Sequence, residues 1–432
     1  MNTLLEIHPS SLTGTITPPP SKSHTMRALI FAMMAKGVST IYYPLRGSDT
    51  NSMLQAMNAF GISVQIFDDR FEVEGSGGSL GPATDVIDAG NSGQILRFLG
   101  ALAALSDRYT IFTGDHSIRH SRPVAPLLEG LSQLGAFATS SRLDGRPPII
   151  IRGPLRGGKA VVNGEDSQPI SALLIASSFL REPTELIVQN PKETPWIDLT
   201  LSWLQRLNIA YLQENYQCYR IQGGASYTEF SFSVPADFSS AAYPIATALV
   251  TDSEIGVKQL DFNDVQGDKA LIYLLQEMGA QIEIIPEAKM LKVKRGSRLK
   301  GKTIDVNPFI DALPLLAVIG CFAEGKTELV NGLVARKKES DRIKAICTEL
   351  KKMGAHIEER PDGLIVHRSI LRGTHLTGWH DHRIVLSLIV AAAGAKGNSR
   401  IDGAQCIDKS YPSFFHDMQQ LGLKLESHFI RL

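Results

Sequence analysis

Six copies of one short pattern are the feature that most constrains the fold of this chain. Each copy is a helix end followed by a strand, and successive copies are 68 to 75 residues apart. Three copies read Met-Gly-Ala or Leu-Gly-Ala, and the other three are weaker variants. Each helix end carries a glycine or an asparagine, the residues that best tolerate a left-handed cap: Gly61, Gly135, Asn208, Gly279, Gly354 and Gly422. Alternating stretches that follow the caps are typical of hairpin strands. The 432 residues are therefore predicted to form six similar units.

A second pattern recurs with the same period, as a polar cluster that opens a long apolar helix. The six clusters begin at Lys22, Asn91, Asp166, Asp237, Asp311 and Asp381. Beyond its first turn each helix is apolar on nearly every side, which predicts that it is buried. Serine, asparagine and aspartate at these starts are good N-caps, and for Asp237 we expect no more than a cap.

Similar units that pack alike would point several of these helix N-termini in one direction. Each N-terminus carries free N–H groups and roughly half a positive charge. Basic residues also stand in or near these first turns, where they oppose the helix dipole: Lys22, Arg27, Arg97 and Arg383. This combination predicts an anion-binding site. A basic run at 336–342 precedes another amphipathic helix and by itself is equally typical of a solvated helix start.

Composition excludes several classes of function. With 44 basic and 44 acidic side chains the net charge is zero, which argues against a dedicated nucleic-acid binder. The four cysteines are scattered, and no metal motif, P-loop or dinucleotide fingerprint is present. No signal peptide is visible in 1–20, and the longest apolar stretch, 384–395, is shorter than the roughly 20 residues of a membrane span. We expect a cytoplasmic protein.

Short motifs along essentially the whole chain resemble the enolpyruvyl transferase family. They are Pro20-Ser21-Lys22-Ser23 with Arg27, Gly90-Asn91-Ser92-Gly93 with Arg97, Arg122-Pro123, Ser167-Gln168, Gln266-Gly267-Asp268, Asp311, Lys338-Glu339-Ser340-Asp341-Arg342, Asp381-His382-Arg383 and Lys409-Ser410-Tyr411-Pro412. Each motif alone is weak, but their order and spacing are specific. Within the family they are most similar to the branch whose acceptor is shikimate 3-phosphate.

The resemblance implies an α/β fold, α+β by some conventions, with two similar domains and six internal repeats. Each domain is expected to hold three βαβαββ units in an inside-out α/β barrel. One domain would be discontinuous, formed by 1–20 and 237–432, and the other continuous, formed by 21–236, with the active site in the cleft between them. The helices near 22, 91 and 166 should then pack in one domain and those near 237, 311 and 381 in the other. The six repeats support this fold independently.

The implied reaction transfers the enolpyruvyl group of phosphoenolpyruvate to the 5-hydroxyl of shikimate 3-phosphate and releases phosphate, on the route to chorismate and the aromatic amino acids. It proceeds by addition and elimination and needs no metal and no organic cofactor. The two substrates are anionic small molecules, so the site needs several fixed cations. The resemblance implies neither a nucleic-acid nor a membrane partner, and we expect a monomer.

The resemblance assigns roles residue by residue. Asp311 would take the proton of the 5-hydroxyl, Glu339 would protonate the methylene carbon, and Lys22 would assist proton transfer. The residues expected to bind phosphoenolpyruvate are Lys22, Gly93, Arg122, Gln168, Arg342, Arg383 and Lys409. Those expected to bind shikimate 3-phosphate are Lys22, Ser23, Arg27, Ser167, Gln168, Asp311 and Lys338.

The chain departs from the family pattern in the half that should hold the acceptor. Asp166 stands where the family usually has serine, and Glu193 stands where a second serine is usual. Val334 and Gln94 replace an expected asparagine and threonine. Asp166 is expected to cap its helix and to pair with a cation, for which Arg119, His120 and Lys192 are candidates. The acceptor could instead lack the phosphate.

Two other readings of the sequence remain open. A sister transferase acts on a UDP-amino sugar, but it usually carries Lys-Asn at the first motif and a reactive cysteine in a mobile loop. This chain has Lys22-Ser23 and no cysteine in 114–122. A non-catalytic relative that binds an anion or a protein would not need an acid and a base together, and this chain has both.

Overall fold

The computed structural model describes residues 2–430 and contains two compact units. Unit 1 is formed by the chain up to Pro19 together with the chain from Pro235 onward. Unit 2 is the continuous segment Pro20–Val234. Prolines stand on one or both sides of the two points where the chain passes from one unit to the other. Their fixed φ angle stiffens the backbone there.

One sheet pattern occurs six times, three times in each unit. In every four-stranded sheet the first two strands are parallel, and the other two are added antiparallel. In five sheets these two strands follow each other in sequence, and in the sixth they are β24 and the N-terminal strand β1. A parallel pair needs a crossover, and a helix supplies it. The result is a βαβαββ unit, so the predicted fold class and its six repeats are confirmed.

Unit 2 contains three of these repeats. The first consists of β14 (Ser231–Ser233), α1 (Lys22–Met34), β3 (Lys36–Tyr42), α2 (Ser48–Ala59), β4 (Val64–Ile66) and β5 (Arg70–Ser76). The second consists of β6 (Ile87–Asp88), η1 (Ile95–Leu99), α3 (Gly100–Ala103), β7 (Thr110–Thr113), α4 (His116–His120), α5 (Ala125–Gln133), β8 (Phe137–Ser140) and β9 (Ile149–Arg152). The third consists of β10 (Gly158–Asn163), α6 (Ser167–Ser178), β11 (Thr184–Gln189), α7 (Thr194–Arg206), β12 (Tyr211–Glu214) and β13 (Cys218–Ile221).

Unit 1 contains the other three. The first consists of β2 (Thr13–Ile16), α8 (Phe238–Val250), β15 (Glu254–Val257), η2 (Gly267–Lys269), α9 (Ala270–Glu277), β16 (Ile282–Ile285), η3 (Pro286–Ala288) and β17 (Met290–Val293). The second consists of β18 (Thr303–Asp305), η4 (Asn307–Ala312), α10 (Leu313–Phe322), β19 (Lys326–Val330), η5 (Leu333–Lys337), α11 (Arg342–Lys352), β20 (His356–Arg360) and β21 (Gly363–His367). The third consists of β22 (His375–Thr377), α12 (His382–Ala393), β23 (Ser399–Asp402), η6 (Ala404–Lys409), α13 (Phe414–Gln420), β24 (Leu425–Ile430) and β1 (Asn2–Ile7).

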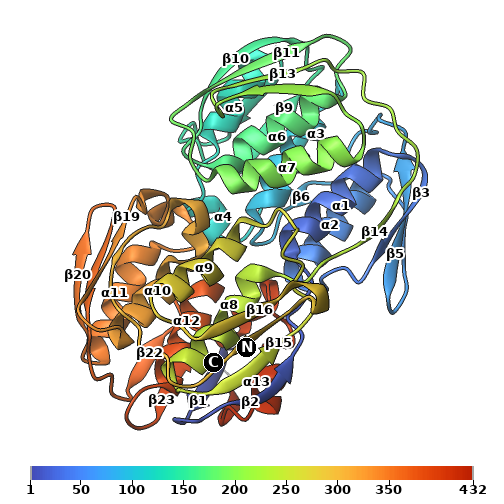
Figure 1. The fold of residues 1–432 in the computed structure, drawn as a ribbon. Helices are drawn as coiled ribbons and strands as arrows, with labels where there is room; N and C mark the ends of the chain where they lie inside the picture. The colour runs from blue at the N-terminus through green and yellow to red at the C-terminus, as the bar shows by residue number, and fades with distance from the viewer. Residues whose placement is uncertain (1, 431–432) are drawn as a thin grey trace. The chain divides into compact units, whose positions relative to one another are not determined.

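In each unit the long apolar helices lie inside and the sheets outside (Figure 1). α8, α10 and α12 pack against one another in unit 1, and α6 packs against η1 and α3 in unit 2. Almost every residue of α8, α10 and α12 is buried, as their apolar sequences predict. Separate cores form around the two sets, so the helices near 22, 91 and 166 belong to one unit and those near 237, 311 and 381 to the other.

The six predicted helix caps have the expected backbone conformation. Positive φ angles occur at Gly61, Gly135, Asn208, Gly279, Gly354 and Gly422. Each follows the second helix of a repeat by two residues, at the end of α2, α5, α7, α9, α11 and α13. The glycine and asparagine pattern therefore reports a real structural period.

Two helix starts differ from the sequence prediction. The helix expected from Asn91 has a π-helical stretch, η1, in its centre. Asp311 does not open a helix: it lies within the 3-10 turn η4, and α10 begins two residues later. In both places a charged residue, Arg97 in η1 or Asp311 in η4, lies where the backbone departs from a regular α-helix. Such departures are common at functional sites.

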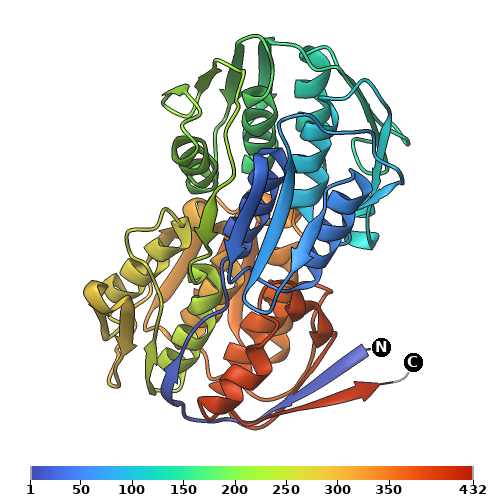
Figure 2. The same ribbon diagram turned by 90° about the vertical axis from the view of Figure 1, so that its right-hand side faces the viewer.

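The first and last strands described pair with each other. β1 lies antiparallel to β24 in one sheet of unit 1, with Ile7 opposite Leu425 (Figure 2). The N-terminal strand thereby completes the sixth repeat, and β14 and β2 supply the first strands of repeats whose helices are far away in sequence. Among the described residues, no helix has the length and apolar character needed to cross a membrane.

Gly363 at the start of β21 gives a test of the sheet packing. A Cβ atom at Gly363 would lie 1.8 Å from the carbonyl oxygen of Leu329, so Gly363→Ala must move the backbone of β19. We expect it to lower the free energy of unfolding by about 2 kcal/mol or more. At Gly81 the nearest atom would lie 3.9 Å away, and Gly81→Ala should change stability by less than about 0.5 kcal/mol. Equal stabilities of the two variants in urea unfolding would contradict this packing.

Candidate active site

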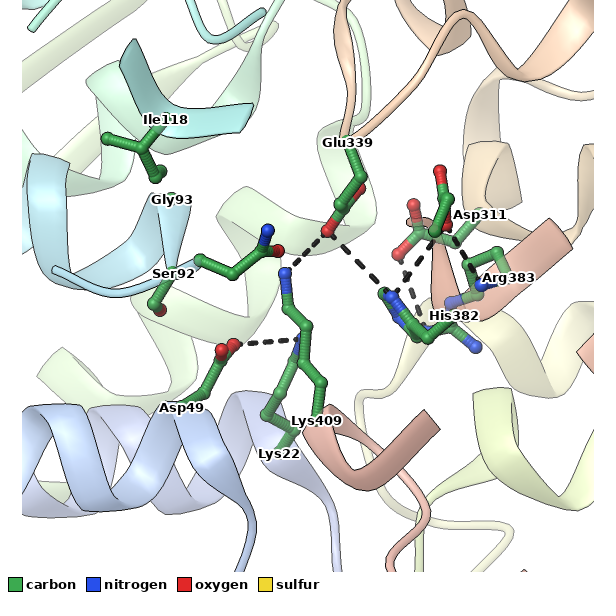
Figure 3. Close-up of polar contacts among 12 residues, drawn as sticks. Lys22, Asp49, Ser92, Gly93, Ile118, Asp311, Glu339, His382, Arg383 and Lys409 are labelled. Atoms are coloured by element: carbon green, nitrogen blue, oxygen red, sulfur yellow. Dashed lines mark hydrogen bonds and ion pairs between the residues drawn. The ribbon is translucent and has the colours of Figure 1, made fainter. Parts of the chain in front are cut away.

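The polar residues singled out from the sequence form two clusters, one in each unit. In unit 1 they come from turns and helix starts: Asp311 in η4, Lys338 and Glu339 before α11, Arg342 at the start of α11, Asp381 and Arg383 at the start of α12, and Lys409 at the end of η6. Figure 3 shows Asp311, Glu339, His382, Arg383 and Lys409 of this cluster. Each element belongs to a repeat whose helices bury their apolar residues in the core of the unit.

Arg342 is the centre of the unit 1 cluster. Its guanidinium is 1% exposed and donates to three carboxylates. Nε lies 2.9 Å from Asp381, Nη1 lies 2.7 Å from Asp311, and Nη2 lies 2.6 Å from Glu339. Burial alone would lower the pKa of Arg342, but these carboxylates raise it well above its ordinary value. A planar group with five donors can hold three acidic groups at fixed angles.

Glu339 lies between two cations. One carboxylate oxygen accepts from Arg342, and the other lies 2.6 Å from Nζ of Lys409. The His382 ring is also close, with Nδ1 4.0 Å from Glu339 (Figure 3). Only 5% of the Glu339 side chain is exposed, so these ion pairs are largely shielded from water.

Asp311 is the more accessible carboxylate of the cluster. Besides Arg342 it faces Arg383, whose Nη2 lies 3.5 Å away. Burial would raise the pKa of Asp311, but Arg342, Arg383 and Lys338 outweigh it and hold the pKa well below the ordinary value. About a quarter of the side chain, 26%, remains exposed. Asp311 is therefore ionised and can accept a proton from a ligand.

Asp268 has the opposite character and faces Arg383 from another element. It lies in η2, which packs against η4, and it is 2% exposed. Burial raises the pKa of Asp268 well above its ordinary value, although Arg383 opposes the shift. Arg383 also lies over the ring of Tyr243, and the tyrosine hydroxyl accepts from Nη1 at 3.4 Å. The cluster thus holds carboxyl groups with widely different pKa values.

The unit 2 cluster begins with Lys22, the first residue of α1. Its ammonium lies 3.3 Å from Asp49 of α2, whose side chain is 3% exposed (Figure 3). Ser21 caps the helix by accepting from the amide of His24. The sequence analysis did not identify Asp49, because Ser48-Asp49-Thr50 resembles an ordinary helix start.

Arg97 holds the middle of the unit 2 cluster. It is 1% exposed and projects from the π-helical stretch η1. Its guanidinium donates to Oε1 of Gln168 at 3.0 Å and pairs with Asp166 at 3.0 Å. Asp166 also caps α6 by accepting from the amide of Gln168. The expected cap and ion pair both form, but the cation is Arg97 rather than one of the three candidates proposed from sequence.

Gly93 is enclosed by the residues expected around the donor substrate. A Cβ atom there would lie 2.8 Å from Arg97, 2.9 Å from Gln168 and 3.3 Å from Arg122. Arg122 is itself buried. The structure therefore brings together Gly93, Arg122 and Gln168, and no larger residue could replace the glycine without moving them.

Arg27 is a buried cation whose hydrogen bonds within residues 2–430 all go to neutral oxygens. Nε donates to Thr200, Nη1 to the carbonyl of Ser23, and Nη2 to the carbonyl of Trp196. Desolvation lowers the pKa of Arg27 to about 9. A buried guanidinium in this state favours the approach of an anion.

Glu193 forms an unexpected contact at the start of α6. Its Oε2 accepts from both the amide and the hydroxyl of Ser167, at 3.1 and 3.0 Å. Ser167 is one of the residues expected to bind the acceptor.

No group of three or more His, Cys, Asp or Glu side chains in the described part of the chain is arranged to hold a metal ion.

Comparison with known proteins gives a consistent result. A family model described as EPSP synthase (3-phosphoshikimate 1-carboxyvinyltransferase) matches residues 7–418. A protein of Acetivibrio thermocellus is 42% identical over 424 residues, which are 98% of this chain and 99% of the relative. A protein of Methanothrix thermoacetophila is 42% identical over 426 residues, with 98% and 99% covered. Both relatives are named 3-phosphoshikimate 1-carboxyvinyltransferase.

Solved structures with the same fold include an EPSP synthase from Acinetobacter baumannii. It is 26% identical, with a TM-score of 0.83 over 99% of this chain and 100% of the other. The enolpyruvyl transferase NikO from Streptomyces tendae has a TM-score of 0.78 over 100% of both chains. At 17% identity this second likeness concerns the fold alone.

Two substitutions at Asp166 separate its charge from its cap. Asp166→Asn keeps a capping oxygen but leaves buried Arg97 without this carboxylate. We expect it to lower the free energy of unfolding by about 1–3 kcal/mol, discounted because 24% of the Asp166 side chain is exposed. Asp166→Ala should cost roughly 1 kcal/mol more, because the cap is lost as well. If urea unfolding finds Asp166→Asn as stable as the wild type, the ion pair contributes nothing.

The pKa of Asp268 gives a pH test. Because its folded-state pKa lies above the unfolded value of about 3.9, the neutral form stabilises the fold at low pH. This stability is lost as the pH rises from that value toward the folded pKa. Asp268→Asn cannot titrate, so its free energy of unfolding should fall less than that of the wild type between pH 4 and pH 8. Asp305→Asn, at an exposed carboxylate, is the control, and parallel profiles for all three proteins would refute the assignment.

Proposed function

Because this chain belongs to the EPSP synthase (3-phosphoshikimate 1-carboxyvinyltransferase) family, we propose that it transfers the enolpyruvyl group of phosphoenolpyruvate to the 5-hydroxyl of shikimate 3-phosphate and releases phosphate. It is a transferase of the shikimate pathway, which leads to chorismate and the aromatic amino acids. The observation that carries the proposed chemistry is the arrangement of Asp311 and Glu339 on two arms of the Arg342 guanidinium.

The donor site is proposed to consist of cations that form ion pairs with carboxylates of the chain. Phosphoenolpyruvate carries a carboxylate and a phosphate, and Arg342, Arg383 and Lys409 match these charges. The remaining donor-binding residues would be Lys22, Gly93, Arg122 and Gln168. When the ligand shares the cations, Asp311 loses part of its electrostatic stabilisation, and its pKa rises. This change would turn Asp311 from a strongly stabilised anion into a useful base.

The reaction then needs two proton transfers of opposite direction. Asp311 takes the proton of the 5-hydroxyl while the oxygen of that hydroxyl bonds to C2 of phosphoenolpyruvate. Glu339 in its protonated form delivers a proton to C3, and the Lys409 ammonium, 2.6 Å from its carboxyl group, stabilises the carboxylate that forms. In the elimination step C3 returns that proton, the double bond re-forms, and phosphate leaves with assistance from Lys22. An ion pair with Asp49, in which Nζ of Lys22 lies 3.3 Å from Oδ2, positions the Lys22 ammonium.

The acceptor is proposed to meet Lys22, Ser23, Arg27, Ser167, Gln168, Asp311 and Lys338. Arg27 suits an anionic group of the acceptor, because its buried charge is bonded only to neutral oxygens within the described residues. No metal or cofactor takes part in the proposed mechanism, and we expect a cytoplasmic monomer. A diverged transferase with an acceptor that lacks phosphate is the second candidate, and Asp166 and Glu193 at the start of α6 favour it.

A phosphate-release assay with phosphoenolpyruvate and shikimate 3-phosphate tests the function directly. Asp311→Asn removes the base but keeps an oxygen for Arg342, and it should lower kcat by roughly a hundredfold to ten-thousandfold. Asp305→Asn, at the end of β18 in the same unit, should leave kcat unchanged. Wild-type protein that releases no phosphate with this pair of substrates would exclude the proposed reaction, and an unchanged kcat in Asp311→Asn would exclude the proposed base.

A further inference from the structure

The contact between Glu193 and Ser167 places an anion of the chain itself at the start of α6. Both donors of Ser167, the amide and the hydroxyl, go to a single oxygen of Glu193. Glu193 is 1% exposed and Ser167 is 2% exposed, so water hardly competes for these bonds. A carboxylate here is also favoured by the dipole of a 12-residue helix.

The backbone of Glu193 shows that this contact is formed against local preference. Its φ angle is +51°, in the left-handed region that residues other than glycine rarely adopt. Glu193 occupies the N-cap position of α7, but its side chain does not cap that helix. Its carboxylate turns instead to α6. Such a conformation persists only where surrounding contacts hold it, and the two hydrogen bonds of Ser167 are contacts of this kind.

We propose that Glu193 is a specificity-determining residue that competes with the anionic group of the acceptor for Ser167. The inference rests on the proposed function, in which Ser167 and Gln168 bind shikimate 3-phosphate. A phosphate cannot accept from Ser167 while Oε2 of Glu193 occupies both donors. Two anions side by side would also repel each other strongly at a buried position. The phosphorylated acceptor therefore binds only after the Glu193 carboxylate has moved away.

The displacement would also reach Arg27 through α7. Two acceptors of Arg27, the carbonyl of Trp196 and the hydroxyl of Thr200, belong to the first two turns of that helix. Glu193 sets the start of α7, so its release from Ser167 frees the helix end that holds Arg27. The Glu193–Ser167 contact and the hydrogen bonds of Arg27 are in this way linked through α7. Glu193 selects for acceptors whose binding energy is sufficient to displace it.

Binding measured by titration calorimetry, with shikimate 3-phosphate and with shikimate as probes, tests the proposal. Glu193→Gln keeps an oxygen that can accept from Ser167 but removes the charge, and Glu193→Ser removes both. We expect the Kd for shikimate 3-phosphate to fall by roughly tenfold to a hundredfold in Glu193→Ser, and in the same direction in Glu193→Gln. The Kd for shikimate, which has no phosphate, should stay the same.

A matched control and an independent measurement make the result decisive. Glu129→Gln removes a charge from the exposed face of α5 in the same unit and should bind both probes like the wild type. A purely structural brace would instead change the Kd of both probes together, and thermal unfolding identifies a variant that does not fold. Equal affinities of wild type and variants for shikimate 3-phosphate overturn the role of Glu193 but leave the proposed function standing. No binding of this probe to any of the proteins overturns both.

Discussion

The guanidinium of Arg342 is the group on which the unit 1 cluster depends. It links Asp311 in η4, Glu339 before α11 and Asp381 at the start of α12. Asp311 and Asp381 lie 31 and 39 residues from Arg342 in sequence, and Glu339 lies 3 residues from it. Three negative charges at this depth would repel one another without it. Because Asp381 also accepts from Ser340 and caps α12, the same cation fixes the start of the helix that carries Arg383. The positions of the proposed base, the proposed acid and the arginine proposed to bind an anion therefore depend on one buried charge.

In both clusters, cations of the chain are paired with carboxylates of the chain. In unit 1 the cations expected to bind the donor are paired with Asp311 and Glu339. In unit 2, Lys22 is paired with Asp49 and Arg97 with Asp166. These acidic side chains keep the cations ordered.

The sequence allowed the repeat architecture to be predicted because the repeat has a local physical cause. Left-handed caps need glycine or asparagine, and buried helices need apolar residues on every side, so both signals are visible without tertiary information. The swapped strands were not predictable in the same way. The residues of β14 do not specify which parallel strand it pairs with, and its pairing with β3 is visible only in the structure. Strand identity in a sheet is set by topology more than by composition.

Individual partners in the site were the least predictable part. Asp166 was expected to pair with Arg119, His120 or Lys192, yet its ion pair is formed with Arg97, which projects from a π-helical stretch. Asp49 and Glu193 resemble ordinary helix starts in the sequence and acquire their roles only through contacts between elements. Residue types at motif positions can be recognised from the chain alone, whereas the pairing of charges depends on which helix ends the core brings together.

The pairing of β1 with β24 has a consequence for how the protein is made. Unit 2 is complete once Val234 has been synthesised, and its first sheet closes only with β14, near the end of that segment. β1 and β2 leave the ribosome before unit 2, but their partner strands β24 and β15 follow after it. During this time unit 2 can fold while the N-terminal strands remain without their sheets. The nascent chain must therefore keep the edges of these strands from pairing wrongly, β2 until β15 has emerged and β1 until β23 and β24 have emerged.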